Sequence, residues 1–198
     1  MLDFMSYIDD LRKDIVFDAE LCGFPLKFHT TWGIFSPREI DEGTRLLLDY
    51  IKVAETDNCL DIGCGYGPIG ICMAKLAPQG HTWMVDRDFI AIDYANKNIH
   101  ANRLGNAEAL LSNGYNQLPR SQKYNVIASN IPAKVGKEML QILLTDTLAS
   151  LEPGGTFYVV TINGLRKFMQ RNFNEYFGNY KKLKQGAHYT VAMATKEA

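Results

Sequence analysis

The sequence predicts an α/β domain with a mostly parallel, seven-stranded sheet that carries an antiparallel strand near its C-terminal end, preceded by an N-terminal extension. From residue 58 onward, short apolar runs alternate with helical patterns, as is typical of parallel sheets. A glycine-rich segment at residues 60–70 follows the first of these runs and opens the first helix. Two successive strand patterns, at 180–184 and 189–195, end the chain without a helix between them, which favours an antiparallel pair.

The five earlier strands are expected at residues 59–62, 82–85, 109–111, 125–128 and 156–160. Helices are expected between them and after the last, at residues 69–76, 89–104, 137–151 and 165–177. Because the regular alternation begins only near residue 57, we expect residues 1–56 to form an extension that packs on a domain formed by residues 57–198.

Two features of the extension predict local structure. The stretch 11–28 mixes short apolar pieces around Gly23, which indicates an irregular segment or a hairpin. Ser36, Pro37 and Glu39 supply a hydroxyl cap, a proline at the first helical position and an acid three residues after the cap. This capping-box pattern predicts that a helix begins at Ser36 and continues toward residue 51, with a possible interruption near Gly43.

The composition is that of an ordinary globular domain, with 198 residues, 46% hydrophobic residues and a formal net charge of -1. A near-neutral chain has no overall attraction to nucleic acid, so an RNA-binding surface would have to be a local patch. The apolar runs are strand-sized and predict no membrane span, and the N-terminus lacks the pattern of a signal peptide. We therefore expect a cytoplasmic protein. The cysteines form no CxxC pair, which predicts reduced thiols and neither a disulfide framework nor a metal site: Cys22, Cys59, Cys64 and Cys72.

The sharpest motif is LDIGCGYGPIG at residues 60–70. Its glycines allow a tight turn and a close approach to a ligand, and we expect Gly63, Cys64 and Gly65 to line the binding site. A glycine-rich loop alone is weak evidence, because it also suits a nucleotide pyrophosphate or a plain connection between strand and helix. Its first acid, Asp61, decides against phosphate, since a carboxylate repels phosphate but accepts a hydrogen bond from a ligand ammonium.

A second acid, Asp86, closes the next strand and is followed by Arg87. A carboxylate at this point can accept both ribose hydroxyls of an adenosine. Asp61 and Asp86 together fit a ligand with an amino-acid end and a nucleoside end, which describes S-adenosylmethionine. The alternative roles are local, with Asp61 capping the loop and Asp86 capping the next helix. Asn113 ends the third strand, where it can accept from the adenine amino group or serve only as a turn residue.

From about residue 25 to the C-terminus, the chain resembles the small methyltransferase domain family, which includes bacterial small-subunit ribosomal RNA guanine-N2 methyltransferases. The resemblance rests on the order and spacing of motifs at residues 33–36, 41–47, 61–70, 86, 129–132, 136–137 and 151–155. It implies the Rossmann-like fold of class I methyltransferases, S-adenosylmethionine as cofactor, and ribosomal RNA as substrate. The family motif after the fourth strand is Asn-Pro-Pro followed by an aromatic or aliphatic residue. Here the motif consists of Asn130, Ile131, Pro132 and Ala133, so the second and fourth positions depart from the aromatic form.

The matched residues are therefore candidates for catalysis. An exocyclic amine is a poor nucleophile because its lone pair is delocalised into the base. The Asn130 amide oxygen and the Ile131 carbonyl can each accept one amine hydrogen and hold the nitrogen in line with the methyl group. Ile131 lacks the stiffness of proline, and we expect Ile131→Pro to be tolerated if the backbone already suits proline.

The fourth motif position bears on substrate binding, because Ala133 cannot stack on a flipped base as an aromatic residue would. Phe35 or Tyr66 is a candidate for the stacking face, with a plain core position as the alternative for either aromatic, and Lys134 is a candidate contact for RNA. Three readings of the function remain open at this point. The chain methylates an exocyclic amine, most simply guanine N2 of ribosomal RNA; or it methylates a protein amide or a small molecule; or it is a cofactor-binding or RNA-binding module with weak catalysis.

Overall fold

The computed structural model describes residues 4–197 and contains one seven-stranded sheet and a separate two-stranded hairpin. The order of strands across the large sheet is β5-β4-β3-β6-β7-β9-β8. Neighbouring strands from β5 to β7 are parallel, whereas β9 runs antiparallel to both β7 and β8. The predicted mostly parallel sheet with an antiparallel C-terminal strand is therefore confirmed. Its strands are β3 (Cys59–Ile62), β4 (Thr82–Asp86), β5 (Ala107–Leu111), β6 (Tyr124–Asn130), β7 (Leu151–Ile162), β8 (Lys181–Gln185) and β9 (Tyr189–Thr195).

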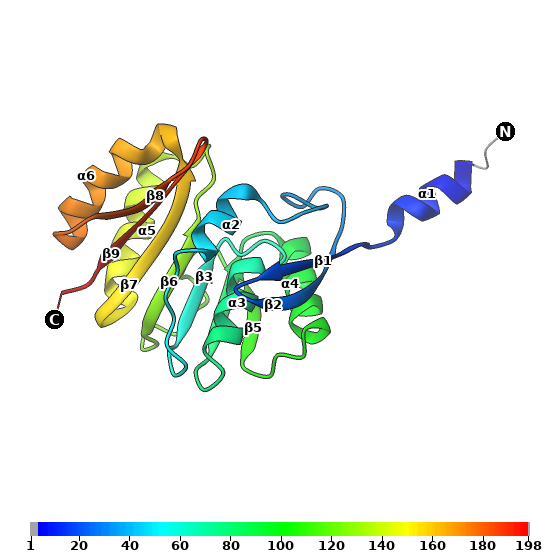
Figure 1. Cartoon of the computed structure of the whole chain (residues 1–198), viewed down its shortest axis with the longest axis horizontal. Coiled ribbons are helices and arrows are strands. Elements are labelled where there is room, and N and C mark those ends of the chain that lie inside the picture. The colour runs from blue at the N-terminus through cyan, green and yellow to red at the C-terminus, as the bar shows by residue number, and fades with distance from the viewer. Residues whose placement is uncertain (1–3, 198) are drawn as a thin grey trace.

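Helices cover both faces of this sheet and enclose two apolar cores (Figure 1). One core packs the helices α2 (Glu42–Leu48), α3 (Pro68–Leu76) and α4 (Phe89–Ala101) against the sheet. The other core packs α5 (Lys137–Ser150) and α6 (Arg166–Phe177), with a short 3-10 turn at Asn163–Leu165 leading into α6. Successive side chains of a strand point to opposite faces, and this is why Leu60 belongs to one core and its neighbour Cys59 to the other.

The N-terminal hairpin pairs β1 (Ile15–Leu21) with β2 (Phe24–Thr30) and lies against α4. Asn98 and Asn102, one turn apart on α4, bond the backbone of alternate β2 residues as a neighbouring strand would. The Asn98 amide accepts from His29 N at 2.6 Å and donates to His29 O at 2.9 Å. The Asn102 amide does the same with the backbone N–H and carbonyl of Lys27, at 3.0 and 2.8 Å. Two buried asparagines therefore attach the hairpin to the domain.

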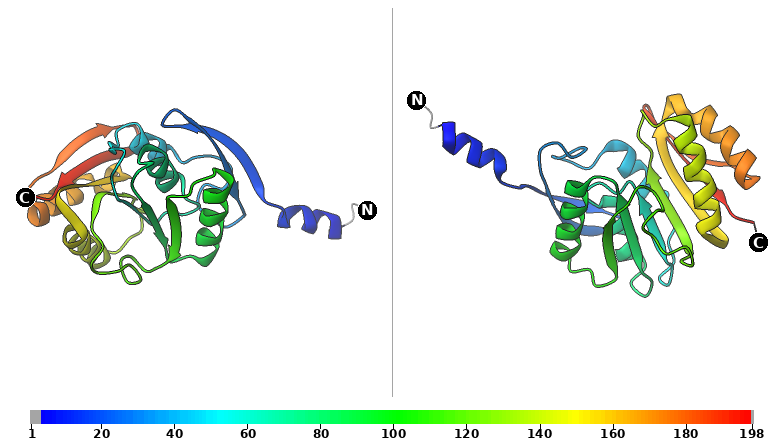
Figure 2. Two further views of the ribbon diagram at one scale, coloured as in Figure 1. Left: turned by 90° about the horizontal axis from the view of Figure 1, so that it is seen from below. Right: turned by 180° about the vertical axis from the view of Figure 1, so that it is seen from behind.

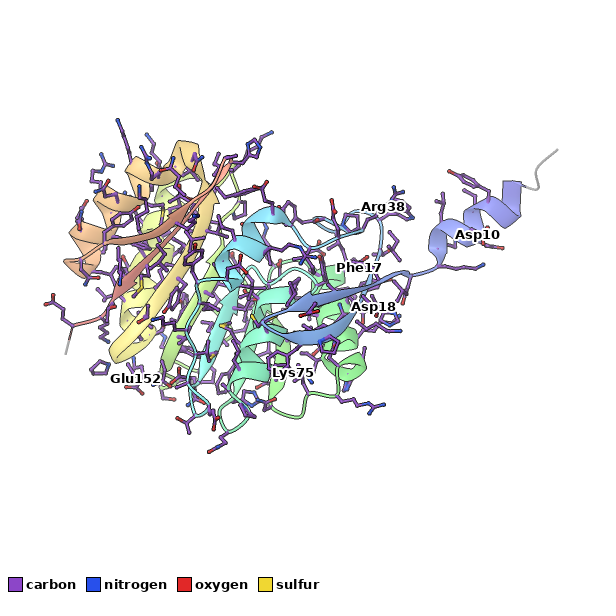
Figure 3. The ribbon with its side chains drawn as sticks, viewed as in Figure 1. Asp10, Phe17, Asp18, Arg38, Lys75 and Glu152 are labelled. Atoms are coloured by element: carbon purple, nitrogen blue, oxygen red, sulfur yellow. The ribbon has the colours of Figure 1, made fainter. Side chains whose placement is uncertain are left out.

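The first helix, α1 (Phe4–Arg12), projects from the body of the molecule, far from the C-terminus (Figure 2). Asp10 marks this helix in Figure 3, where Arg38 marks the long loop between β2 and α2. The sequence predicted no helix at 4–12, and of the two outcomes expected for 11–28 it is the hairpin that forms. The division of the chain at residue 56 stays a prediction.

The helix predicted from the capping-box pattern was wrong, because α2 begins at Glu42 and its N-cap is Asp41. Ser36 instead has a positive φ of 49°, and its hydroxyl bonds the Glu39 carbonyl at 2.6 Å. The backbone carbonyls that a helix would use are occupied by side chains of other elements. The Tyr66 hydroxyl donates to the carbonyls of Ser36 and Glu39, and the Thr30 hydroxyl donates to the carbonyl of Pro37.

The strand order reverses beside β3, since the chain runs outward from β3 to β4 and β5 before it crosses to β6. In open α/β sheets, ligands bind at the carboxyl ends of the strands at such a switch point. The register aligns Asp61 of β3 with Met84 of β4 and Ala128 of β6. The residues that follow these three positions therefore meet at one edge, which places the glycine-rich loop beside the end of β6.

Candidate functional site

The glycine-rich loop turns between β3 and α3 through three residues in the left-handed region of backbone conformation. The φ angles of Gly63, Gly65 and Gly67 are 70°, 56° and 98°. A Cβ atom built on Gly63 or Gly65 would meet no protein atom within 4 Å. The glycines are therefore required for the turn itself, and the space beside them is open to a ligand.

The loop differs from a phosphate cradle in how its backbone N–H groups are used. Gly63 and Cys64 both donate to the carbonyl of Val85, at 2.8 and 3.0 Å. Gly65 donates to the Asp86 carboxylate at 3.0 Å, and Gly70 donates to the Asp61 carboxylate at 2.8 Å. A phosphate site would direct such donors at the ligand. This loop therefore suits a ligand whose contacts are not phosphate oxygens.

Asp61 is fully buried, and only one of its two carboxylate oxygens has a hydrogen-bond partner within residues 4–197. Its Oδ2 accepts from Gly70 in the first turn of α3, so the capping role considered above is real. Its Oδ1 has no hydrogen-bond partner within residues 4–197. Burial raises the pKa of Asp61 to about 7, against the lowering effect of the Gly70 hydrogen bond. A buried carboxylate oxygen without a donor fits the ammonium group of an amino-acid ligand, which would supply both the charge and the hydrogen bond.

Asp86 lies at the end of β4 and is half-buried, with both carboxylate oxygens already anchored. Oδ2 accepts from Gly65 N and Oδ1 from Asp88 N, each at 3.0 Å. The N-cap of α4 is Asp88 rather than Asp86. Each carboxylate oxygen has a second lone pair that remains available to a ribose hydroxyl. The orphaned oxygen of Asp61, the open space beside the glycines and the fixed carboxylate of Asp86 fit S-adenosylmethionine.

The remaining predicted cofactor residues contribute less. The Cys64 side chain is buried and bonds the Gly65 carbonyl, and burial raises the pKa of its thiol well above the ordinary value. It therefore shapes the loop as a small apolar residue and is not a thiolate. Arg87 and Asn113 are exposed at the edge of the sheet. The turn that carries Asn113 is held by Ser112, whose N–H donates to the Asp86 carbonyl at 2.8 Å.

Asn130 is the last residue of β6, and its side chain is held by the start of α2. Its amide nitrogen donates to Asp41 Oδ2 at 2.9 Å and to Thr44 Oγ1 at 3.0 Å. Both amide hydrogens are thereby used, which leaves Oδ1 as the side-chain atom that can accept from a substrate. Ser129, which sequence reasoning did not select, donates to the Ile62 carbonyl at 2.8 Å and ties the end of β6 to the end of β3.

Ile131 stands where the family motif has proline, and its backbone is held by a hydrogen bond instead of a ring. Its N–H donates to the Val160 carbonyl of β7 at 3.0 Å, and its side chain is 3% exposed in the second core. The Ile131 carbonyl is therefore held by the sheet rather than by a ring. A proline here would lose that hydrogen bond and the buried side chain, so we now expect Ile131→Pro to be destabilising rather than tolerated. Pro132 follows on the surface.

The residues predicted to meet a substrate divide into exposed and buried ones. Phe35 is 65% exposed on the loop before α2, and Lys134 is exposed on the loop after β6. Tyr66 was wrongly considered as a stacking face, since it is 3% exposed and packs edge-on against Phe28. Its hydroxyl secures the loop that carries Phe35.

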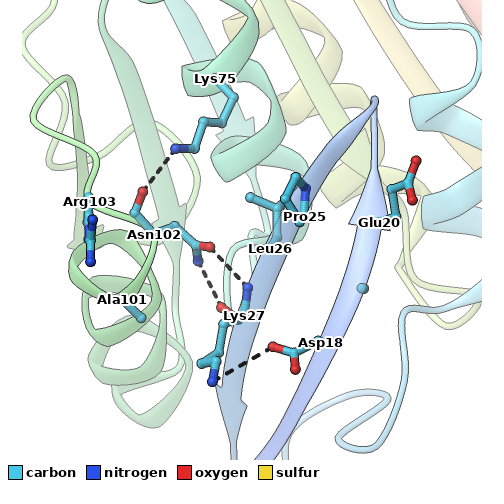
Figure 4. A pocket seen from close by; sticks show the side chains of 10 residues that line it. Asp18, Glu20, Pro25, Leu26, Lys27, Lys75, Ala101, Asn102 and Arg103 are labelled. Carbon is cyan, nitrogen blue, oxygen red and sulfur yellow. Dashed lines mark hydrogen bonds and ion pairs between the residues drawn. The ribbon is translucent and has the colours of Figure 1, made fainter.

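A separate hollow of about 530 Å³ lies between the hairpin and the ends of α3 and α4 (Figure 4). Its polar groups bond one another: Lys75 donates to the Asn102 carbonyl, and Lys27 lies 3.9 Å from Asp18. None of the residues that line it belongs to the predicted cofactor site. Within residues 4–197, no cluster of three His, Cys, Asp or Glu side chains is placed to hold a metal ion. The same residues include no helix that is long and apolar enough to cross a membrane.

The fold, the strand order and the carboxylates at the carboxyl ends of β3 and β4 together define a Rossmann-like methyltransferase domain. The model of the methyltransferase small domain family matches residues 25–193, and the chain belongs to this family of S-adenosylmethionine-dependent methyltransferases. The predicted family, fold class and cofactor are therefore confirmed.

Three comparisons describe the relatives. The uncharacterised protein YbxB of Bacillus subtilis is 30% identical over 134 residues, 67% of each chain. The ribosomal RNA small subunit methyltransferase C of Hamiltonella defensa is 28% identical over 174 residues, covering 86% of this chain and 50% of that protein. A T. thermophilus 16S rRNA N2 methyltransferase, solved in complex with AdoMet and guanosine, is 28% identical with a TM-score of 0.83, covering 92% of this chain and 50% of that one. The chain thus spans about half the length of the ribosomal RNA methyltransferases it matches.

Proposed function

We propose that this chain transfers a methyl group from S-adenosylmethionine to an exocyclic amine, namely N2 of a guanine in ribosomal RNA. The observation that carries the proposal is the fixed amide of Asn130, whose nitrogen is bound by Asp41 and Thr44 and whose oxygen is left to accept. The register pairs Asp61 with Ala128, so Asn130, two residues further along β6, is at the same edge of the sheet as the glycine-rich loop, which supports this proposal. Relatives named as ribosomal RNA methyltransferases, and a structural neighbour solved with guanosine, support the choice of substrate.

The cofactor would be held at both ends by residues of this chain. Asp61 Oδ1 would accept from its ammonium group, and the Asp86 carboxylate would accept from its ribose hydroxyls. The open space beside Gly63 and Gly65 would let the cofactor approach the backbone of the loop, and Asn113 and Arg87 would contact its adenine end. When bound, the cofactor supplies an electrophilic methyl group on a sulfonium.

The acceptor amine would be oriented by two oxygens. Asn130 Oδ1 and the Ile131 carbonyl each accept one amine hydrogen, which holds the nitrogen in place and favours the geometry needed for attack. The Val160 hydrogen bond fixes the Ile131 carbonyl in the role that a proline would otherwise fill. Pro132 follows on the surface, next to these two oxygens in the chain. No strong base is needed, because the amine proton becomes acidic once the nitrogen carries the methyl group.

Substrate contacts would come from the two loops that flank this amide. Phe35, which is exposed on the loop before α2, would stack on an unstacked base and take the role that an aromatic residue at position 133 would have. Trp32 on the same loop is 44% exposed and lies beneath the Arg38 guanidinium at 4.7 Å, so the loop combines aromatic surface with positive charge. Lys134 would contact the phosphate backbone. A substrate in ribosomes also agrees with a cytoplasmic location.

The two other readings make different predictions. A protein amide has the same pair of hydrogens as a guanine amine, so Asn130 would suit it equally well, and the label would appear in ribosomal protein. A module with weak catalysis would bind cofactor and RNA without turnover. The hydrogen bond from the Ile131 N–H to the Val160 carbonyl favours the enzyme over this last reading, because it holds the backbone of the altered motif in place.

The test is methyl transfer to separated ribosomal subunits from cells that lack the protein, with tritium-labelled S-adenosylmethionine as donor. After transfer, the RNA and protein fractions are separated and counted. We expect the label in RNA with the wild type and its loss with Asn130→Ala. Label in the protein fraction would favour the amide reading, and binding of cofactor without label in either fraction would favour the binding module.

A further inference from the structure

Asp41 and Thr44 occupy positions that sequence reasoning had matched to the family without giving them a role. Asp41 is the N-cap of α2 and accepts from the N–H of Thr44 at 3.0 Å through Oδ2. The same oxygen accepts from the Asn130 amide, 89 residues away in sequence, and the Thr44 hydroxyl accepts the second amide hydrogen. A helix cap and a candidate catalytic side chain therefore share one carboxylate oxygen.

We propose that Asp41 and Thr44 are positioning residues that fix which end of the Asn130 amide faces the acceptor amine. This inference rests on the proposed function. The two ends of an asparagine amide have nearly the same shape but opposite hydrogen-bonding character. Only the oxygen can accept an amine hydrogen, whereas the amide nitrogen would present a donor to another donor. An amide free to turn over would spend part of its time in the unproductive orientation.

An ionised carboxylate removes this ambiguity because it can only accept. If the Asn130 amide turned over, its oxygen would face Asp41 Oδ2, and two acceptors would meet at hydrogen-bond distance. The charge on Asp41 also polarises the amide toward its oxygen, which strengthens Oδ1 as an acceptor. Asp41 thus selects one orientation and strengthens the oxygen that it exposes, and the Thr44 hydroxyl holds that orientation by accepting the second amide hydrogen.

The Asp41 carboxylate is itself held from the other side. The Tyr189 hydroxyl of β9 donates to Oδ1 at 3.2 Å, so the carboxylate is bonded at both oxygens. A Cβ atom at Gly43 would lie 2.9 Å from the Tyr189 ring and 3.0 Å from Asp41 Oδ2. The glycine of the segment Asp41-Glu42-Gly43-Thr44 therefore makes room for the tyrosine that completes the network. The network joins α2, β6 and β9 around a single amide.

The test uses the double variant Asp41→Ser with Thr44→Val. Serine keeps a good N-cap for α2, and valine keeps the shape of threonine, so the helix is preserved while both acceptors for Asn130 are removed. Asp57→Ser is the matched control, since Asp57 caps a turn by accepting from Ala54 N at 2.7 Å and has no contact with the site. Asp41→Asn keeps the shape of the side chain but removes the charge and adds a donor, so it tests whether an acceptor-only group is needed.

Single-turnover methyl transfer to ribosomal subunits is measured for these variants, alone and combined with Asn130→Ala. We expect the double variant to slow transfer by about tenfold or more with unchanged affinity for S-adenosylhomocysteine, Asp41→Asn to slow it by a smaller factor, and Asp57→Ser to retain most of the rate. In the Asn130→Ala background, the double variant should cause no further loss. An equal loss in both backgrounds would show that the pair acts on the fold and would overturn the inference.

A second readout does not depend on activity. The side-chain amide of Asn130 gives two proton signals that are identified by their disappearance in Asn130→Ala. In the wild type these protons should exchange slowly with solvent, and in the double variant they should exchange at least about tenfold faster. Unchanged exchange would overturn the inference. If Asn130→Ala itself transfers at the full rate, the proposed function fails, and the amide exchange still decides whether Asp41 and Thr44 hold this side chain.

Discussion

Cofactor binding should depend on pH through Asp61, because burial raises the pKa of this carboxyl to about 7. Its unpartnered oxygen is expected to accept from the ligand ammonium, and only the ionised form carries the opposite charge. With a pKa near 7, the ionised fraction rises from about 9% at about pH 6 to about 76% at about pH 7.5. The dissociation constant for S-adenosylhomocysteine should therefore fall by roughly eightfold over this range.

The assay is isothermal calorimetry of S-adenosylhomocysteine at several pH values, on the wild type and on Asp61→Asn. The variant keeps an oxygen to accept from Gly70 but has no charge that titrates. We expect it to bind more weakly and with little change between the two pH values. Identical pH dependence in the two proteins would refute the assignment of Asp61 to the ammonium group.

Four further results are expected. The folded-state pKa of Asp61 lies above its unfolded value of 3.8, so the ligand-free wild type should lose stability relative to Asp61→Asn as pH rises from about 4 to about 7. Melting temperatures that change equally with pH in the two proteins would contradict this. Asp86→Ala should weaken S-adenosylhomocysteine binding by about 1–3 kcal/mol in calorimetry, and unchanged affinity would remove Asp86 from the site. Gly65→Val should abolish that binding and cost about 1–3 kcal/mol of unfolding free energy, since its φ of 56° strains a branched residue; normal binding would show that the loop does not line the pocket. Ile131→Pro should lower stability by about 1–3 kcal/mol through the lost bond to Val160, and a urea titration with an unchanged midpoint would contradict this.

The sequence was sufficient to predict the sheet because its signals are local. The conformation of each apolar run and of the glycine-rich loop at 60–70 can be predicted from its own residues, and the two final strand patterns lie next to each other in the chain. The acids Asp61 and Asp86 were found for the same reason, since each lies at or next to the carboxyl end of a predicted strand.

The capping-box pattern at Ser36 failed because a competing set of tertiary hydrogen bonds takes its carbonyls. Tyr66 lies in the glycine-rich loop, and the sequence of residues 36–39 contains no signal that the Tyr66 hydroxyl bonds these carbonyls. The true N-cap, Asp41, has the expected residue type, with a threonine three positions later. A purely local comparison of the two candidate caps cannot choose between them, because both satisfy helix-start chemistry.

The hydrogen bonds that hold the Asn130 amide could not be predicted from the sequence, for a related reason. Its partners come from a helix start 86 and 89 residues earlier, and their pairing depends on how α2 sits over the end of β6. The same holds for Ile131, which stands where the family motif has proline and whose N–H donates to a carbonyl of β7. Long-range contacts of this kind decide side-chain orientation, and orientation decides whether an asparagine accepts or donates.

The central claim is that the oxygen of Asn130 directs methyl transfer to guanine N2 in ribosomal RNA. The most direct measurement is mass spectrometry of nucleosides from ribosomal RNA after reaction with S-adenosylmethionine carrying a deuterated methyl group. The account predicts N2-methylguanosine bearing the label with the wild type, and at least about tenfold less with Asn130→Ala. A labelled nucleoside other than N2-methylguanosine, or an equal yield from the two proteins, would contradict it.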